Sequence, residues 1–423
     1  MSYATTRFGR SMLFITIVLL PLENHLPPVM GFSILFLIFA ALAVYLFLNQ
    51  PEAADRVWLH PVFITAYLFV CLTILFEFAS PLSMYLDISR FALMIGGSVL
   101  IASLCRDRSA LRACLYGYIC AATWLSVLIF SMSYEPLQDT TANNYAEASE
   151  IRSEVFANSP LRANLNVMAF TCSQGALVAF ALGILRRHSN LRITFLVIAL
   201  FCMAASFMTM SRGSIAMTLA TCAVILFSLG IRHGKKMLIG ALFALTLFWL
   251  TPDLIWVRIM AGIEGSSSEE GRLESRFALY DAALEHLPEY FLTGVGEGNC
   301  LKEWGPKSGF VDCAWVHNTF FHITIFWGLP ALLAFIFIIV QAYRCIPANP
   351  GRDALCLSVL GIAVSSLLLL PFTHNFYDKL FSLSLGLVVG SHCWIWPKGI
   401  IKAEEQQEDF IAPLSFASNS PRV

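Results

Sequence analysis

The chain has 423 residues, of which 57% are hydrophobic and only 13% are charged, and its mean hydropathy is +0.70. This composition excludes an ordinary soluble protein, and a formal net charge of −1 gives no indication of a nucleic-acid partner. Apolar runs of about 20 residues, the length that crosses a bilayer, recur along the chain. The sequence therefore predicts an all-α, polytopic membrane protein in which residues 1–423 form a single integral membrane domain.

About twelve transmembrane helices are predicted from the apolar runs. Pro21, Pro27 and Pro28 close the short first span, so the first two spans could instead form a re-entrant hairpin. Arg7 and Arg10 precede the first apolar run as in a signal peptide, but no small-residue cleavage pattern follows, so an uncleaved helix is expected. In chain order, the spans are expected at residues 11–22, 29–48, 59–77, 88–105, 112–133, 163–185, 191–210, 213–230, 236–252, 316–342, 354–371 and 376–396.

The basic residues indicate how the chain is oriented. Most of the 27 lysines and arginines fall in one alternate set of short loops and ends, and the other set is nearly free of them. Because short basic loops stay in the cytoplasm, both termini are expected there, including a cytoplasmic tail at 397–423. A smaller loop at 134–162 and a large loop at 253–315 would then face the periplasm.

The large loop is expected to contain a helix. It begins with the linker-like sequence GIEGSSSEEG, and Pro288 is expected to end or bend the helix that follows. TGVGEGN then predicts a turn rather than a nucleotide-binding loop, because no strand precedes it. One apolar stripe at helical spacing predicts the helix: Leu273, Phe277, Tyr280, Leu284 and Leu287.

Ten of the twelve cysteines lie in or beside apolar spans, where cysteine behaves as a small hydrophobic residue. Cys300 and Cys313 lie in the large loop instead, and they could form a disulfide or remain two free thiols. No CxxC pair and no Cys/His spacing in the sequence suggests a metal site.

Three polar positions stand out because they interrupt or adjoin apolar helices on one predicted side of the membrane. Arg212 lies in the short turn of MTMSRGSIAM, Arg276 opens the amphipathic stretch RFALYDAALEHL, and His317–Asn318 stand where a polar loop enters a span. One imidazole and two guanidiniums on one membrane face suggest a site for a phosphorylated lipid. Each also has a plainer interpretation: Arg212 could snorkel, Arg276 could be an exposed surface charge, and His317 could be an interfacial histidine.

Four further residues are weaker candidates. Arg90, in LDISRFALM, is another arginine at an outer helix end, and snorkelling to the headgroups is the favoured interpretation. His374 and Asp378, in THNFYDKL, sit in another outer turn and could border the same cavity. His322 lies deeper in an apolar run and is expected to be structural.

MTMSRGSIA, SRFALYDAALEHLPEYFLTGVGEGN and AWVHNTFFHITIFWGLPALL together resemble the O-antigen ligase and polymerase superfamily. The order of these segments, the predicted spans and the single dominant outer loop fit the same family. FANSPLRANLNVMAF resembles the polar helix entry of these proteins. The resemblance covers residues 160–335, and topology extends it to the rest of the chain.

The resemblance implies a membrane glycosyltransferase of the GT-C type in the bacterial inner membrane. Members of this family transfer a glycan from undecaprenyl diphosphate to an acceptor hydroxyl at the periplasmic face. Membrane lipids would surround the protein. By resemblance, Arg212 and Arg276 would bind the diphosphate leaving group, and His317 would accept the acceptor's proton. Direct attack of the acceptor hydroxyl would invert the configuration at the anomeric carbon. The other residues expected to contact substrates are Asn318, Arg90 and His374.

No metal and no cofactor are expected. Many transferases of lipid-linked oligosaccharides hold a cation with paired acidic residues in an early outer loop. The first outer turn here, PLENHLPPV, has only Glu23, and no DxD motif occurs in the chain. Two arginines on the diphosphate would make a divalent cation redundant.

Three functions remain open at this point. An O-antigen ligase, whose acceptor is the lipid A–core saccharide, is favoured by the RFALYDAAL helix and by one dominant outer loop. A repeat-unit polymerase, whose acceptor is another lipid-linked glycan, is the alternative within the family. A transporter or flippase would show broken spans in two halves and charges at mid-membrane, whereas the charges here cluster at outer helix ends.

Overall fold

Every regular element in the described part of the chain is helical, which confirms the predicted all-α class. The computed structural model describes residues 5–19, 34–49, 56–77, 81–132, 165–186, 188–230, 234, 238, 272–308, 316–373 and 379–396. The helices are α1 (Arg7–Leu19), α2 (Ile34–Asn49), α4 (Pro61–Glu77), α5 (Pro81–Leu104), α6 (Arg108–Phe130), α9 (Leu165–Leu185), α10 (Ser189–Met208), α11 (Arg212–Leu229), α14 (Arg272–Tyr290), α15 (Gly305–Ser308), α16 (Thr319–Arg344), α17 (Ala354–Leu369) and α18 (Lys379–Trp394). Short helical turns are η3 (Glu297–Asn299), η4 (Cys300–Trp304), η5 (Pro350–Arg352) and η6 (Leu370–Phe372).

Six of the described helices are long and apolar enough to cross a membrane: α6, α9, α10, α11, α16, and α17 with its extension to Phe372. Shorter apolar runs lie in α2, α4, α5 and α18. The chain is therefore a multi-pass membrane protein by length and composition. The predicted span at 236–252 lies outside the described residues except for residue 238, so the number twelve remains a prediction.

Helix α9 is the centre of the bundle. Its residues from Met168 to Ile184 are buried, and it packs against α6, α10, α11 and α17. A helix that is apolar on all sides belongs in such a position. A Cβ added at Gly175 would overlap the side chain of Ala122, so this glycine allows α6 and α9 to cross closely.

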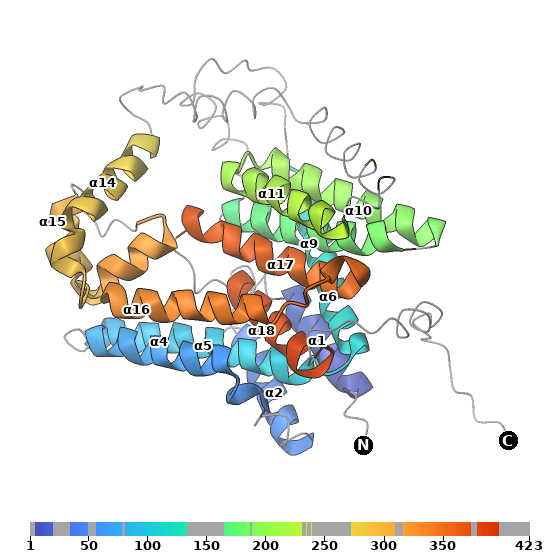
Figure 1. Cartoon of the computed structure of the whole chain (residues 1–423), viewed down its shortest axis with the longest axis horizontal. Coiled ribbons are helices and arrows are strands. Elements are labelled where there is room, and N and C mark those ends of the chain that lie inside the picture. The colour runs from blue at the N-terminus through green and yellow to red at the C-terminus, as the bar shows by residue number, and fades with distance from the viewer. Residues whose placement is uncertain are drawn as a thin grey trace, which may run out of the picture.

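Helix α16 is broken near its first third. Figure 1 shows its short first part standing at an angle to the long second part. The break is at Gly328, whose φ of 75° and ψ of 177° are not helical, and Pro330 follows it. Proline lacks a backbone N–H and cannot continue the hydrogen-bond ladder, which accounts for a break at this point.

The segment after α14 pairs with this break. The N–H groups of Val295 and Gly296 donate to the carbonyls of Ile325 and Phe326, both at 2.8 Å, and that of Leu329 donates to the carbonyl of Phe291 at 2.6 Å. These bonds satisfy backbone groups that a broken helix would otherwise leave unpaired.

The TGVGEGN sequence makes this close approach possible. Gly294 has a φ of 69°, and a Cβ there would overlap the carbonyl of Phe326. The predicted turn is confirmed, and it also packs directly against the backbone of α16.

The apolar face predicted for α14 needs correction. Leu284 is 53% exposed, whereas Leu279 and Ala283 are buried. The buried face is rotated because α14 packs against α16 and α15, where the small Ala283 fits the contact. Pro288 does not end the helix, which continues to Tyr290.

The cysteines behave largely as predicted. Ten are free thiols, and most of these are buried or partly buried among apolar residues. Cys300 is buried and disulfide-bonded. Cys313, the partner that the sequence suggests, lies outside the described residues.

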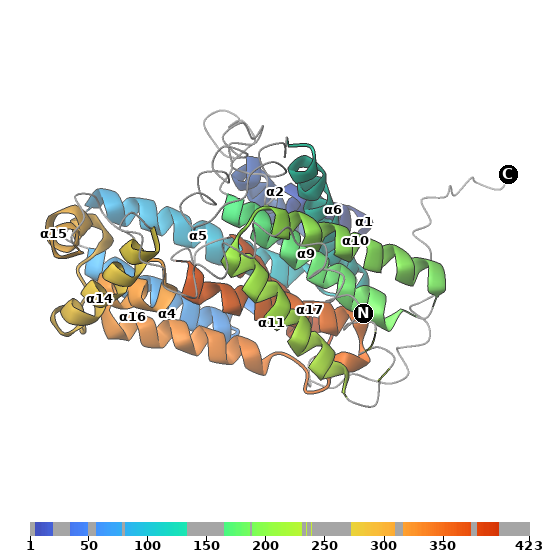
Figure 2. The ribbon, with the colours of Figure 1, turned by 90° about the horizontal axis from the view of Figure 1, so that it is seen from above.

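Figures 1 and 2 show α14 and α15 gathered at one end of the bundle, beyond α4, α5 and α16. Residues 272–308 of the predicted large loop therefore form a helical structure at the same end as the N-terminus of α16. This end contains the candidate site.

Candidate active site

Arg212 is held by a tight turn between α10 and α11. It is the first residue of α11 and is partly exposed, and only three residues separate it from the end of α10. Met210, within that turn, has a φ of 56°, which side chains of this size rarely adopt. The Thr209 hydroxyl donates to the carbonyl of Ser206 at 2.6 Å, and it accepts from the N–H of Ser211 at 3.3 Å. The strained turn therefore fixes the position from which the Arg212 side chain extends.

A cluster of buried hydroxyl groups lies next to the turn between α10 and α11. The Oγ atoms of Ser173, Ser206 and Ser214 lie 2.7–2.8 Å from one another, and the Thr218 hydroxyl donates to Ser173 Oγ at 2.7 Å. The cluster joins α9, α10 and α11, and Ser214 is two residues after Arg212. Ser and Thr bonds between helices are a usual means of fixing membrane helices to one another.

His317 and Asn318 lie at the N-terminus of α16. The Oδ1 atom of Asn318 accepts from the N–H groups of Phe320 at 3.0 Å and Phe321 at 3.3 Å, which makes it the helix cap. Both residues are partly exposed. The cap engages the oxygen of Asn318, so its amide nitrogen is the part suited to a substrate contact.

Helix α14 is attached to this position by Tyr280. Its hydroxyl donates to the backbone carbonyl of His317 at 2.9 Å, and its ring lies 5.7 Å from that of Phe321. Arg276 is four residues before Tyr280, which places both on the same face of α14. The side chain of Arg276 lies outside the described part of the structure.

Arg212 and His317 are linked through the turn after α17. A Cβ added at Gly213 would lie 3.4 Å from Phe372 Cβ and 3.7 Å from Phe170 Cζ, so the start of α11 packs on η6. One residue further, the carbonyl of Thr373 accepts from the Thr319 hydroxyl at 2.7 Å. The N-termini of α11 and α16 therefore meet at one turn.

The geometry favours an anion. Helix N-termini carry about half a positive charge, which remains at α16 although the Asn318 cap accepts from the N–H groups of Phe320 and Phe321. Two such ends, one beginning with an arginine and the other preceded by a histidine, converge at residues 370–373.

Residues 195–336 match the family model described as O-antigen ligase. This segment, about a third of the chain, is similar to the O-antigen ligase family. The matched segment contains Arg212, the whole of α14, His317, and Asn318, which caps α16. It supports a membrane enzyme of the O-antigen ligase and polymerase type that acts on a lipid-linked glycan and a lipid acceptor. No curated protein matches the chain.

The remaining candidate residues are less well placed. Arg90 belongs to α5, which packs against η3, but its side chain lies outside the described residues. His374 and Asp378 lie outside them as well. His322 is fully buried, with its ring centroid 4.5 Å from that of Phe326 and 5.5 Å from that of Trp327, as a structural residue would be.

Several residues that shape the site escaped the sequence analysis. Tyr280 was recognised only as an apolar position, and Thr319 and Thr373 were not singled out. Ser173, Ser206 and the other members of the hydroxyl cluster were also missed. Hydroxyl residues recurring inside apolar runs were the available signal.

Proposed function

We propose that the chain is an O-antigen ligase of the bacterial inner membrane. It would transfer a glycan from undecaprenyl diphosphate to a lipid A–core saccharide at the periplasmic face. The observation that carries this proposal is the junction at Thr373. There the N-termini of α11 and α16 meet, and Tyr280 attaches α14 to the same place.

The proposed role of Arg212 and Arg276 is to bind the diphosphate. The leaving group gains negative charge as the bond to the sugar breaks, and a guanidinium holds phosphate oxygens in a fork that never deprotonates. The N-terminus of α11 adds its own positive end at Arg212. Such donors, placed in advance, lower the barrier because they meet charge that appears only in the transition state.

His317 is proposed as the general base. It would take the proton of the acceptor hydroxyl as that oxygen attacks the anomeric carbon, with inversion of configuration. Histidine suits this step because it titrates near neutral pH. Tyr280 holds the backbone of His317 in position, and the amide nitrogen of Asn318 is oriented by its cap. Arg90 and His374 are proposed to contact the substrates.

The proposed reaction needs no metal. Two guanidiniums and two helix N-termini supply the positive charge that a divalent cation supplies in other transferases of lipid-linked glycans. All of these groups come from the chain itself, so the charge is in place before the donor binds.

A gene deletion followed by gel analysis of lipopolysaccharide tests the function. We expect loss of the whole O-antigen ladder, with polymer accumulating on the lipid carrier and restoration by the wild-type gene. A core bearing one repeat unit would identify a polymerase instead. An unchanged ladder would contradict both.

A further inference from the structure

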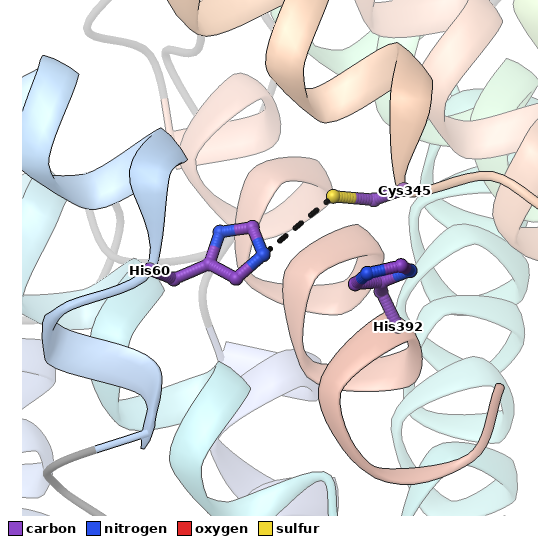
Figure 3. Close-up of side chains that lie close together, drawn as sticks. All are labelled: His60, Cys345 and His392. Carbon is purple, nitrogen blue, oxygen red and sulfur yellow. Dashed lines mark hydrogen bonds between the residues drawn. The ribbon is translucent and has the colours of Figure 1, made fainter. Parts of the chain in front are cut away.

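Two histidines and a cysteine meet at the end of α16 opposite to His317. Figure 3 shows His60, Cys345 and His392 facing a common point. Cys345 Sγ lies 3.9 Å from His60 Nε2, and the two imidazole centroids are 5.8 Å apart. One ligand atom from each residue lies within 4.8 Å of the other two. In the described part of the chain, this is the only such group of three metal-ligating side chains.

Three different segments supply these side chains. His60 directly precedes α4, Cys345 is the C-terminal cap of α16, and His392 is in the last turn of α18. The part of α16 after its break, residues 329–344, is 16 residues long, which corresponds to about 24 Å at 1.5 Å per residue. The cluster is thus remote from the proposed glycan-transfer site and takes no part in it.

One of the three side chains has a buried nitrogen that no described residue satisfies. His392 Nδ1 is buried and has no hydrogen-bond partner among the described residues. A buried nitrogen without a partner is costly unless a ligand occupies it. The Cys345 thiol is buried, and a cation that binds its sulfur displaces the thiol proton.

We infer that His60, Cys345 and His392 form a binding site for a soft divalent cation of the zinc class. Imidazole nitrogen and thiolate sulfur are the ligands such cations prefer, at about 2.0–2.3 Å. A cation at the centre of the observed triangle would draw the three atoms inward by small side-chain rotations. Water would complete a tetrahedron.

The binding step has a defined proton balance. The cation binds neutral imidazoles, and the Cys345 thiol releases one proton to solvent. In the structure, the N–H of Val62 donates to His60 Nδ1 at 3.3 Å. Ligation of a cation through His60 Nε2 would place the ring proton on Nδ1, and this hydrogen bond would be lost. Binding therefore replaces one long hydrogen bond with a metal bond.

The site would join the ends of α4, α16 and α18. These ends have no other covalent link in the described residues, and in sequence His60 and Cys345 are 285 residues apart. A cation held by all three would therefore resist separation of the helices at this end.

Cobalt spectroscopy on the full chain, purified in detergent without a histidine tag, tests the inference. We expect one Co²⁺ per chain, with a thiolate-to-cobalt charge-transfer band and the visible bands of a tetrahedral site, and displacement by Zn²⁺. Cys345→Ser should abolish the charge-transfer band, and His60→Gln or His392→Gln should weaken Zn²⁺ binding by at least about 100-fold. Cys120→Ser and His286→Gln, outside the cluster, are matched controls and should bind as the wild type does.

Two results would overturn the site. One is wild-type protein that shows no thiolate-to-cobalt band and retains no zinc after dialysis, a result that depends on no variant. The other is zinc binding that Cys345→Ser leaves unchanged. Because Cys345→Ser could unfold the chain, its metal-free melting temperature is compared with that of metal-free wild type. If it is unfolded, the two histidine variants decide.

Discussion

The hydroxyl of Tyr280 donates to the backbone carbonyl of His317 at 2.9 Å, and this bond joins α14 to the start of α16. Arg276 precedes Tyr280 by one turn, so the bond also holds the turn of α14 that carries the second arginine. In the proposed mechanism, one group stabilises the leaving group and the other activates the acceptor. Their separation must therefore be held constant.

Tyr280→Phe tests this relationship. It retains the ring packing against Phe321 and removes only the hydroxyl. A hydrogen bond of this kind contributes about 1 kcal/mol, so we expect transfer to fall about five- to tenfold, measured with purified protein and a lipid-linked donor. Tyr343→Phe, at a position that is 71% exposed on α16, is the control and should leave the rate unchanged. An unchanged rate in Tyr280→Phe would show that the bond does not position the site.

The arginines are tested by Arg212→Ala and Arg276→Ala. Each should cut transfer by about 10²- to 10³-fold, as expected for loss of one donor to a developing negative charge, without preventing membrane insertion. Lysine should restore activity only in part, because an ammonium cannot reproduce the guanidinium fork. Arg192→Ala, at the opposite end of α10, is the matched control. A normal glycan ladder from either alanine variant would remove that arginine from the site.

His317→Ala should reduce turnover by about 10²- to 10⁴-fold while donor binding remains nearly intact. His317→Gln should be almost as inactive, because an amide can hydrogen-bond the acceptor but cannot take its proton. His322→Ala, which empties a buried position, should act mainly on stability. Single-turnover kinetics and donor-binding measurements separate these effects. Near-wild-type turnover in His317→Gln would leave His317 only an orienting role.

Metal independence is tested by transfer in the presence of EDTA. We expect activity to persist, since the arginines supply the charge on the diphosphate. The assay is best repeated in Cys345→Ser, where removal of a cation from the His60 cluster cannot contribute. If activity is lost and only added Mg²⁺ or Mn²⁺ restores it, the two-arginine account is wrong.

Cys300 is disulfide-bonded, and we predict that Cys313 is its partner. The bridge would close a loop of about 14 residues and contribute about 3 kcal/mol by the chain-entropy model. Thiol labelling of the unreduced, denatured protein should modify ten cysteines, and reduction should add two. Modification of both Cys300 and Cys313 without reductant would exclude the bridge.

The class of protein follows from the sequence by itself. Uninterrupted apolar runs leave the backbone no alternative to helices in a bilayer, so span positions such as 163–185 and 191–210 agree closely with α9 and α10. Local order also placed His317 at a helix entry and Arg212 in a short turn. These features depend on neighbouring residues, which a pattern can register.

Only the tertiary structure decided which of these ends meet. The junction at Thr373 and the close approach of Gly294 to the broken α16 depend on helix packing, which no local pattern encodes. The apolar face of α14 was predicted wrongly at Leu284, which is exposed, for the same reason. Periodicity identifies an apolar stripe, but the packing partner decides which part of the helix is buried. His60 and Cys345 are 285 residues apart, so their proximity appears only once α4 and α16 lie side by side.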